Sequence, residues 1–131
     1  MTENDGGVVA VVDDDARFLE STRDLLESAG YSANAFLSAQ SFLESGILAV
    51  VNCLITDIGM PVTDGFQLCR QARERRPDLP VIFITGRSEE TTYGRAAAEG
   101  HHGLFRKPYD AAELLASVDR AVGSRAKGDL S

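Results

Sequence analysis

A seven-residue run at positions 50–56 is the feature that most constrains how this chain folds. Its residues are mostly β-branched or apolar, with Asn52 as the strongly polar exception, and such a run is typical of a central parallel strand covered on both faces. Asp57 follows directly, and residues 59–61, Gly-Met-Pro, then indicate a turn. We therefore predict that Asp57 lies at the carboxyl edge of a sheet, where open α/β folds bind their ligands.

Four further strand patterns and five helix patterns alternate along the chain. The helices are predicted from apolar residues at helical spacing together with capping and stop residues. Asp15 is expected to cap the first helix, and Asp64 with Gln67 and Asp110 with Glu113 form capping-box patterns. The predicted strands are 8–12, 31–36, 50–56, 81–85 and 104–105. The second and fourth predicted helices are 38–44 and 88–99. The first helix is expected to stop at Gly30, the third to end before Pro77, and the fifth to stop at Gly123.

This alternation predicts an α/β fold with a doubly wound, five-stranded parallel sheet. We expect the flavodoxin-like (βα)5 strand order 2-1-3-4-5, in which strands one and three are neighbours and Asp13 and Asp14 come beside Asp57. Residues 1–123 are expected to form a single domain. Residues 124–131 show no periodicity, and we expect a frayed C-terminal tail or a truncated linker there.

The residues that end four of the strands could together carry out phosphoryl chemistry. Two like charges 4 Å apart cost about 4 kcal/mol at an effective dielectric of 20, so the carboxylates of Asp13, Asp14 and Asp57 need a cation. Oxygen ligands favour Mg²⁺. With Lys107 as a second positive charge and the Thr85 hydroxyl as a donor, Asp57 could act as a nucleophile towards a phosphoryl group.

Each of these residues also has a purely structural interpretation. Residues 13–15, all aspartates, could simply cap the first helix, Thr85 could be an ordinary strand residue, and Lys107 could be solvated. His101 and His102 are adjacent and have no evident third ligand, so we interpret them as loop residues. The functional hypothesis is favoured because an acidic pair, a carboxylate, a hydroxyl and a lysine end strands one, three, four and five respectively.

The charge and hydropathy of the chain limit which partners it is expected to bind and where in the cell it is expected to lie. The net charge of −7 would repel a polyanion, so direct binding to nucleic acid is not expected. The sequence has no apolar run near the roughly 20 residues of a membrane span, and its first residues are polar and acidic, which predicts a cytoplasmic protein. Cys53 and Cys69 are expected to be buried, reduced thiols.

Four sequence blocks in this order resemble the CheY-like receiver domain of bacterial two-component response regulators: VVDDD, LITDIGMPVTDGFQL, VIFITGR and LFRKPYDAAEL, across residues 8–123. The spacing within the blocks is similar to receivers of the FixJ type, which usually precede a helix-turn-helix output domain. The resemblance implies that Asp57 is the phosphoacceptor and that Asp13, Asp14, Asp57 and the Gly59 carbonyl hold Mg²⁺. It further implies that Lys107 and Thr85 contact the phosphoryl group, and that the peptide bond between Lys107 and Pro108 is cis.

A receiver would take its phosphoryl group from a histidine kinase or a phosphotransfer protein, and would catalyse only its own phosphorylation and dephosphorylation. Phosphorylation would then alter binding to partners or self-association, including a homodimer through the fourth helix, the fifth strand and the fifth helix. A departure from the family pattern is Leu104, which stands where an aromatic switch residue is usual, while Phe105 should face the opposite side of the strand.

Three other protein classes are weighed against this hypothesis. A degenerate receiver that binds partners without phosphorylation remains the main alternative. A phosphatase of the haloacid dehalogenase type needs a second aspartate where Gly59 stands. A dinucleotide- or flavin-binding protein needs a glycine-rich turn after the first strand, and residues 13–15 are aspartates instead.

Overall fold

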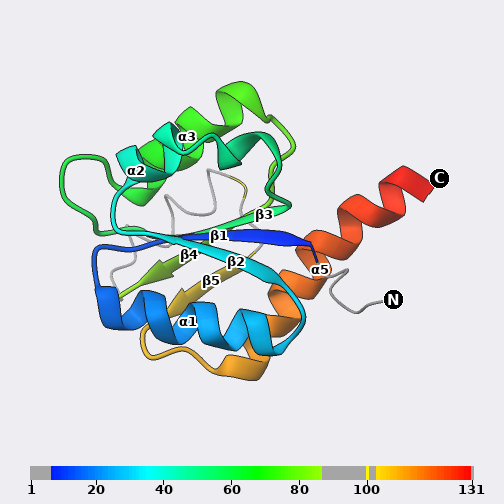
Figure 1. Ribbon diagram of the computed structural model, residues 1–131, viewed down its shortest axis with the longest axis horizontal. Coiled ribbons are helices and arrows are strands. Elements are labelled where there is room, and N and C mark those ends of the chain that lie inside the picture. Colours follow the sequence, from blue (N-terminus) through cyan, green and yellow to red (C-terminus); the bar gives the residue numbers. More distant parts are fainter. Residues whose placement is uncertain (1–6, 87–99, 101–102, 131) are drawn as a thin grey trace.

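Five parallel strands form a single sheet in the order β2-β1-β3-β4-β5 in the computed structural model, so the predicted topology is confirmed (Figure 1). The structure describes residues 7–86, 100 and 103–130. The helix predicted at 88–99 and the two histidines lie outside these residues. The strands are β1 (Val8–Val12), β2 (Ser32–Phe36), β3 (Cys53–Asp57), β4 (Val81–Thr85) and β5 (Gly103–Arg106), and the helices are α1 (Ala16–Ser28), α2 (Ala39–Glu44), the 3-10 helix η1 (Ile47–Ala49), α3 (Gly65–Arg75) and α5 (Ala111–Leu130).

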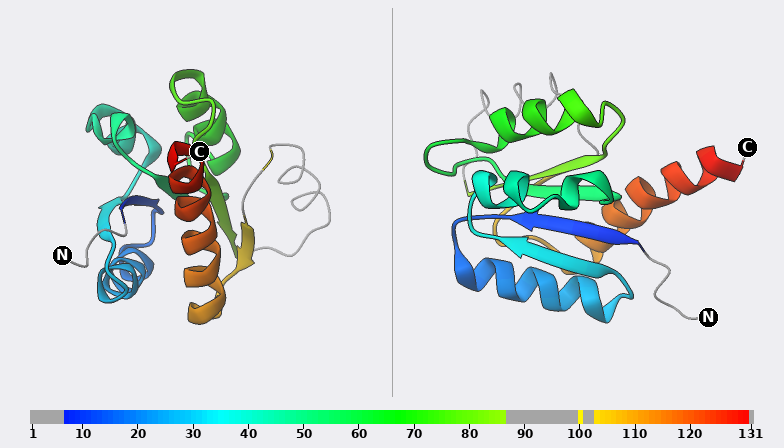
Figure 2. Two further views of the ribbon diagram at one scale, coloured as in Figure 1. Left: turned by 90° about the vertical axis from the view of Figure 1, so that its right-hand side faces the viewer. Right: turned by 45° about the horizontal axis from the view of Figure 1, so that its top comes forward.

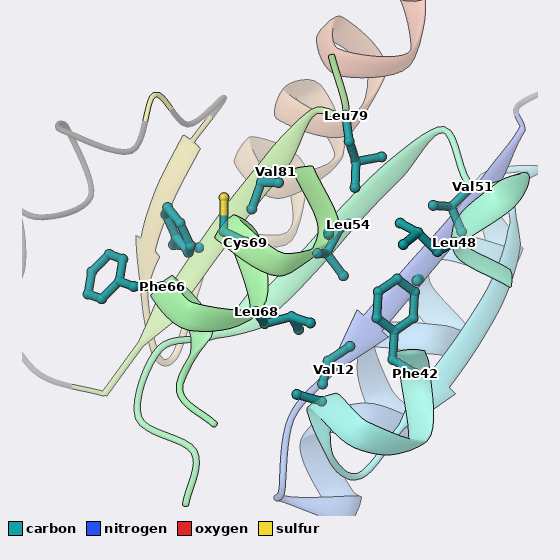
Figure 3. Close-up of a cluster of buried hydrophobic side chains, with 14 of the residues drawn as sticks. Val12, Phe42, Leu48, Val51, Leu54, Phe66, Leu68, Cys69, Leu79 and Val81 are labelled. Carbon is teal, nitrogen blue, oxygen red and sulfur yellow. The ribbon is translucent and has the colours of Figure 1, made fainter. Parts of the chain in front are cut away.

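The helices cover both faces of this sheet. Figures 1 and 2 show α2 and α3 on one face and α1 and α5 on the other. Phe42, Leu54 and Phe66 belong to the apolar cluster between the sheet and the first pair of helices (Figure 3). A second cluster, which includes Leu26 and Leu114, fills the opposite side. Because both faces are buried, β3 and β4 are apolar along nearly their whole length.

Several helix ends follow from local sequence as predicted. The carboxylate of Asp15 accepts the amides of Arg17 and Phe18, at 3.0 and 3.3 Å, and so caps α1. Gly30 follows α1 with a φ of 97°, the left-handed conformation that favours glycine. Asp64 and Gln67 form the full capping box at the start of α3.

The third strand begins later than predicted. The sequence suggested residues 50–56, but β3 spans Cys53–Asp57 and Val50 is 60% exposed. The amides of Val50 and Val51 donate to the carbonyl of Ile47, at 3.0 and 3.1 Å, and so belong to the turn that ends η1. The apolar run therefore begins before the strand itself does. The sequence pattern shows that these residues are apolar, but it does not show which carbonyl each amide binds.

The last helix also differs from its prediction. The predicted stop at Gly123 is wrong, since α5 runs from Ala111 to Leu130. Gly123 lacks the positive φ found at Gly30 and Gly46, so it continues the helix in place of ending it. Figure 1 shows the C-terminal turns of α5 extending beyond the sheet.

Leu104 and Phe105 lie on opposite faces of β5, as predicted. Leu104 packs against the cluster beneath α2 and α3, and Phe105 packs against the cluster beneath α1 and α5. Cys53 and Cys69 are buried and free, also as predicted. No helix within the described part of the chain is both long enough and apolar enough to cross a bilayer.

Candidate functional site

Strand register brings the predicted site residues to the carboxyl edge of the sheet, at the left in Figure 1. Val12 pairs with Thr56, so Asp13 and Asp57 each follow a paired residue on adjacent strands. On the other side, Asp57 pairs with Ile84, and Thr85 comes next. The amide of Lys107 donates to the carbonyl of Thr85 at 2.8 Å, which places Lys107 at the same edge.

Asp13, Asp14 and Asp57 form the acidic cluster that the sequence predicted. One carboxylate oxygen from each of the three residues lies within 4.8 Å of the other two. Asp13 is fully buried and Asp57 is 7% exposed, whereas Asp14 is exposed. Asp13 Oδ1 accepts the amide of Asp15 at 2.9 Å, so this side chain also orders the turn that leads into α1.

Lys107 extends its ammonium group into this cluster. Its Nζ lies 2.8 Å from Asp13 Oδ2 and 4.0 Å from Asp57 Oδ1. Apart from this ion pair, no described residue donates a hydrogen bond to Asp13 Oδ2. The peptide bond between Lys107 and Pro108 is cis, as the family resemblance implied.

The electrostatics of the site leave negative charge uncompensated. Burial, with a smaller contribution from the charge of Asp13, raises the pKa of Asp57 to about 6, although Lys107 and the backbone N–H of Gly59 oppose this. Burial also raises the pKa of Asp13. For Lys107, burial acts to lower the pKa, but the hydrogen bond to Asp13 and the charge of Asp57 outweigh it and raise the pKa. A lysine alone therefore does not balance three carboxylates.

A divalent cation fits this donor set. The donors are oxygens that converge at one edge, as Mg²⁺ requires, and Asp13 Oδ2 is a buried oxygen with no hydrogen-bond donor besides the ammonium of Lys107. Asp13, Asp14 and Asp57 could hold the ion. Gly59 is exposed and follows β3, and its N–H bonds the carboxylate of Asp57.

Thr85 is 2% exposed and ends β4 at this edge. The backbone bond from Lys107 and the pairing of Asp57 with the preceding residue place it among the other site residues. The structure thus brings Asp13, Asp14, Asp57, Thr85 and Lys107 to the same sheet edge, while the carbonyl of Gly59 stays a predicted ligand.

Two residues at the site were not identified from the sequence. Gly65, the first residue of α3, lies so close to the strand that a Cβ there would meet the Asp57 carbonyl oxygen at 2.4 Å. Its place directly after the capping Asp64 was the only sequence signal. Phe18 has the helical spacing of an apolar residue of the first helix, but its ring centroid lies 4.4 Å from Lys107 Nζ. Helical periodicity contains no signal for that contact.

Comparison with known proteins agrees with this geometry. A family model described as response regulator receiver domain matches residues 9–119. The chain is 34% identical over 115 residues to the response regulator protein TodT of Pseudomonas putida, covering 88% of this chain and 51% of TodT. It is 33% identical over 119 residues to the transcriptional regulatory protein FixJ of Azorhizobium caulinodans, covering 91% of this chain and 56% of FixJ. The chain therefore spans about half the length of these relatives.

A solved structure shows the same architecture. The crystal structure of a response regulator receiver domain protein from Clostridium thermocellum matches this chain with a TM-score of 0.85 and 25% sequence identity. The match covers 92% of this chain and 97% of that chain.

Proposed function

The chain belongs to the receiver domain family of response regulators, and on that basis we propose that Asp57 accepts a phosphoryl group in two-component signalling. The observation that carries the proposal is the cluster itself. One oxygen from each of three carboxylates lies within 4.8 Å of the other two, and the ammonium of Lys107 lies 4.0 Å from Oδ1 of the proposed acceptor. An aspartate with a purely structural role would not need two further carboxylates and an ammonium group beside it at a sheet edge.

In the proposed reaction, a carboxylate oxygen of Asp57 attacks the phosphorus of a phosphohistidine on a histidine kinase or a phosphotransfer protein. The new O–P bond forms as the P–N bond breaks, and the electron pair returns to the imidazole nitrogen. Bound Mg²⁺, held by Asp13, Asp14, Asp57 and the Gly59 carbonyl, would supply the positive charge that phosphoryl transfer needs. Lys107 contributes a second positive charge, and the Thr85 hydroxyl is the proposed hydrogen-bond donor to the phosphoryl oxygens.

The proposed output is a change in association and not the turnover of a substrate. The protein would catalyse only its own phosphorylation and dephosphorylation, in the cytoplasm. Phosphorylation would favour partners or a homodimer through the region of residues 88–99, β5 and α5. Residues 1–123 are the proposed receiver, and 124–131 its C-terminal extension. Leu104 packs in the cluster beneath α2 and α3, and we propose that this residue gives a looser switch than an aromatic side chain would.

Intact-mass measurement tests the acceptor directly. Wild-type protein is incubated with Mg²⁺ and acetyl phosphate, and we expect one phosphoryl group per chain. Asp57→Asn should remain unlabelled because an amide has no anionic oxygen nucleophile. Asp78→Asn, an exposed substitution before β4, is the matched control and should be labelled like the wild type.

The main alternative is a receiver that binds partners without phosphorylation. It predicts that the wild type takes up no phosphoryl group from acetyl phosphate or from a phosphorylated histidine donor, with Mg²⁺ present. Equal labelling of wild type and Asp57→Asn would instead show that another residue is the acceptor.

A further inference from the structure

Three groups of two chemical kinds surround the ammonium of Lys107. Two are the carboxylates of Asp13 and Asp57, at 2.8 and 4.0 Å from Nζ. The third is the aromatic ring of Phe18, whose centroid is 4.4 Å from Nζ. This distance is well inside the roughly 6 Å over which a ring face attracts a cation. The Lys107 side chain is only 24% exposed, so water screens this attraction only in part.

The ring of Phe18 is held in place from two directions. Its backbone amide is bound by the capping carboxylate of Asp15, at 3.3 Å, in the first turn of α1. Its ring packs edge-to-face on Tyr109, with centroids 5.6 Å apart and planes at 89°. The Tyr109 hydroxyl lies 2.9 Å from the hydroxyl of the buried Thr22, one turn further along α1.

Phe18 is therefore pre-positioned by α1 and by the segment that follows Lys107. From these contacts we infer that Phe18 is a positioning residue for Lys107. The ring face holds the ammonium beside Asp57, while the carboxylate of Asp13, which is closer to the ammonium, attracts it away from Asp57. This inference rests on the proposed role of Lys107 in phosphoryl transfer to Asp57.

The physical effect of the ring is to limit where the ammonium can go. A lysine side chain has four rotatable bonds and a strongly hydrated charge. Without an aromatic face, the ammonium would be held by the carboxylates alone and would be freer to turn to water. Holding a charged group near its working position lowers the reorganisation that the transition state requires.

Substitutions at Phe18 test the role of the ring face. Phe18→Leu keeps an apolar side chain but removes the π face, and we expect the rate of labelling by acetyl phosphate to fall about three- to tenfold. Phe18→Tyr keeps the face and should restore a rate close to that of the wild type. Mg²⁺ affinity should change less than about twofold, since the carboxylates are intact.

The matched control is Phe42→Leu. Phe42 is fully buried in the other apolar cluster, so the same substitution there perturbs packing at least as much while leaving Lys107 untouched. Equal slowing by Phe42→Leu and Phe18→Leu would mean that the effect comes from packing, which overturns the inference. In a Lys107→Gln background, Phe18→Leu should cause no further slowing, because there is no ammonium left to position. An undiminished effect in that background would also overturn it.

A spectroscopic measurement separates the contact from the reaction. Protons above an aromatic ring are shifted upfield, so the ε-methylene protons of Lys107 should be upfield in the wild type and return to ordinary values in Phe18→Leu. Absence of this shift in the wild type overturns the inference whatever the labelling rates are. A wild type that shows the shift but takes up no phosphoryl group would instead overturn the proposed function, and would leave only the contact between Phe18 and Lys107 established.

Discussion

Replacing Asp57 by asparagine should stabilise the metal-free protein at neutral pH, although it abolishes the proposed phosphorylation. The reason is the raised pKa of Asp57, which burial, with the charge of Asp13, moves from its ordinary value of 3.8 to about 6. Since the folded state holds the proton more tightly than the unfolded state, ionising this group opposes folding. Asparagine has a similar shape and carries no charge.

The magnitude follows from the two pKa values. They differ by 6 − 3.8 = 2.2. A difference of one in pKa corresponds to about 1.4 kcal/mol, so ionised Asp57 lowers the free energy of unfolding by about 3 kcal/mol. The sign of the pH dependence is set by the raised pKa: the cost is absent below about pH 4, grows as pH rises, and is complete above about pH 6 to 7. The gain from Asp57→Asn should therefore be largest at pH 7.5 and fall well below about 1 kcal/mol near pH 4.

Urea unfolding in the presence of a chelator measures this difference at pH 7.5, 5.5 and 4. Asp78→Asn is the control for removing an exposed carboxylate, and its effect should stay within about 0.5 kcal/mol at every pH. Adding Mg²⁺ should reverse the order, because a cation that binds the folded wild type stabilises it by mass action. An Asp57→Asn variant that is no more stable than the wild type at pH 7.5, or a gain that persists unchanged at pH 4, would refute the argument.

Three further substitutions test other parts of the structure. Asp14→Asn should weaken Mg²⁺ binding and slow labelling while leaving Asp57 as the acceptor, and a magnesium titration identical to that of the wild type would exclude Asp14 as a ligand. Gly65→Ala should cost about 2 kcal/mol or more of unfolding free energy, because its Cβ would meet the Asp57 carbonyl oxygen at 2.4 Å; an unchanged urea midpoint would contradict this. Tyr31→Phe removes the hydroxyl that donates to Asp119 on α5 and should cost about 1 kcal/mol in the same assay, whereas no loss would show that this bond does not stabilise the helix.

The sequence alone determined the features that depend on near neighbours in the chain. Asp15 caps α1 and Asp64 with Gln67 opens α3 because each cap bonds amides two or three residues away. Alternation of strands and helices also indicated a parallel sheet, since parallel strands need crossover helices, and the expected strand order 2-1-3-4-5 is the one observed. Once that topology holds, the residues that end β3 and β4 and the residues that follow β1 and β5 meet at one edge. Asp13, Asp57, Thr85 and Lys107 could therefore be predicted together.

Tertiary structure decided the features that depend on residues far apart in sequence. Val50 and Val51 are apolar enough for a strand, but Arg76 donates to the carbonyls of Leu48 and Val51, at 2.7 and 2.9 Å, and holds this segment as a turn. Phe18 has the spacing of a core residue, yet its neighbour is the ammonium of a lysine 89 positions away (107 − 18 = 89). Periodicity reports which face of a helix is buried, and only the packing of that face against another segment determines which charge lies over the ring.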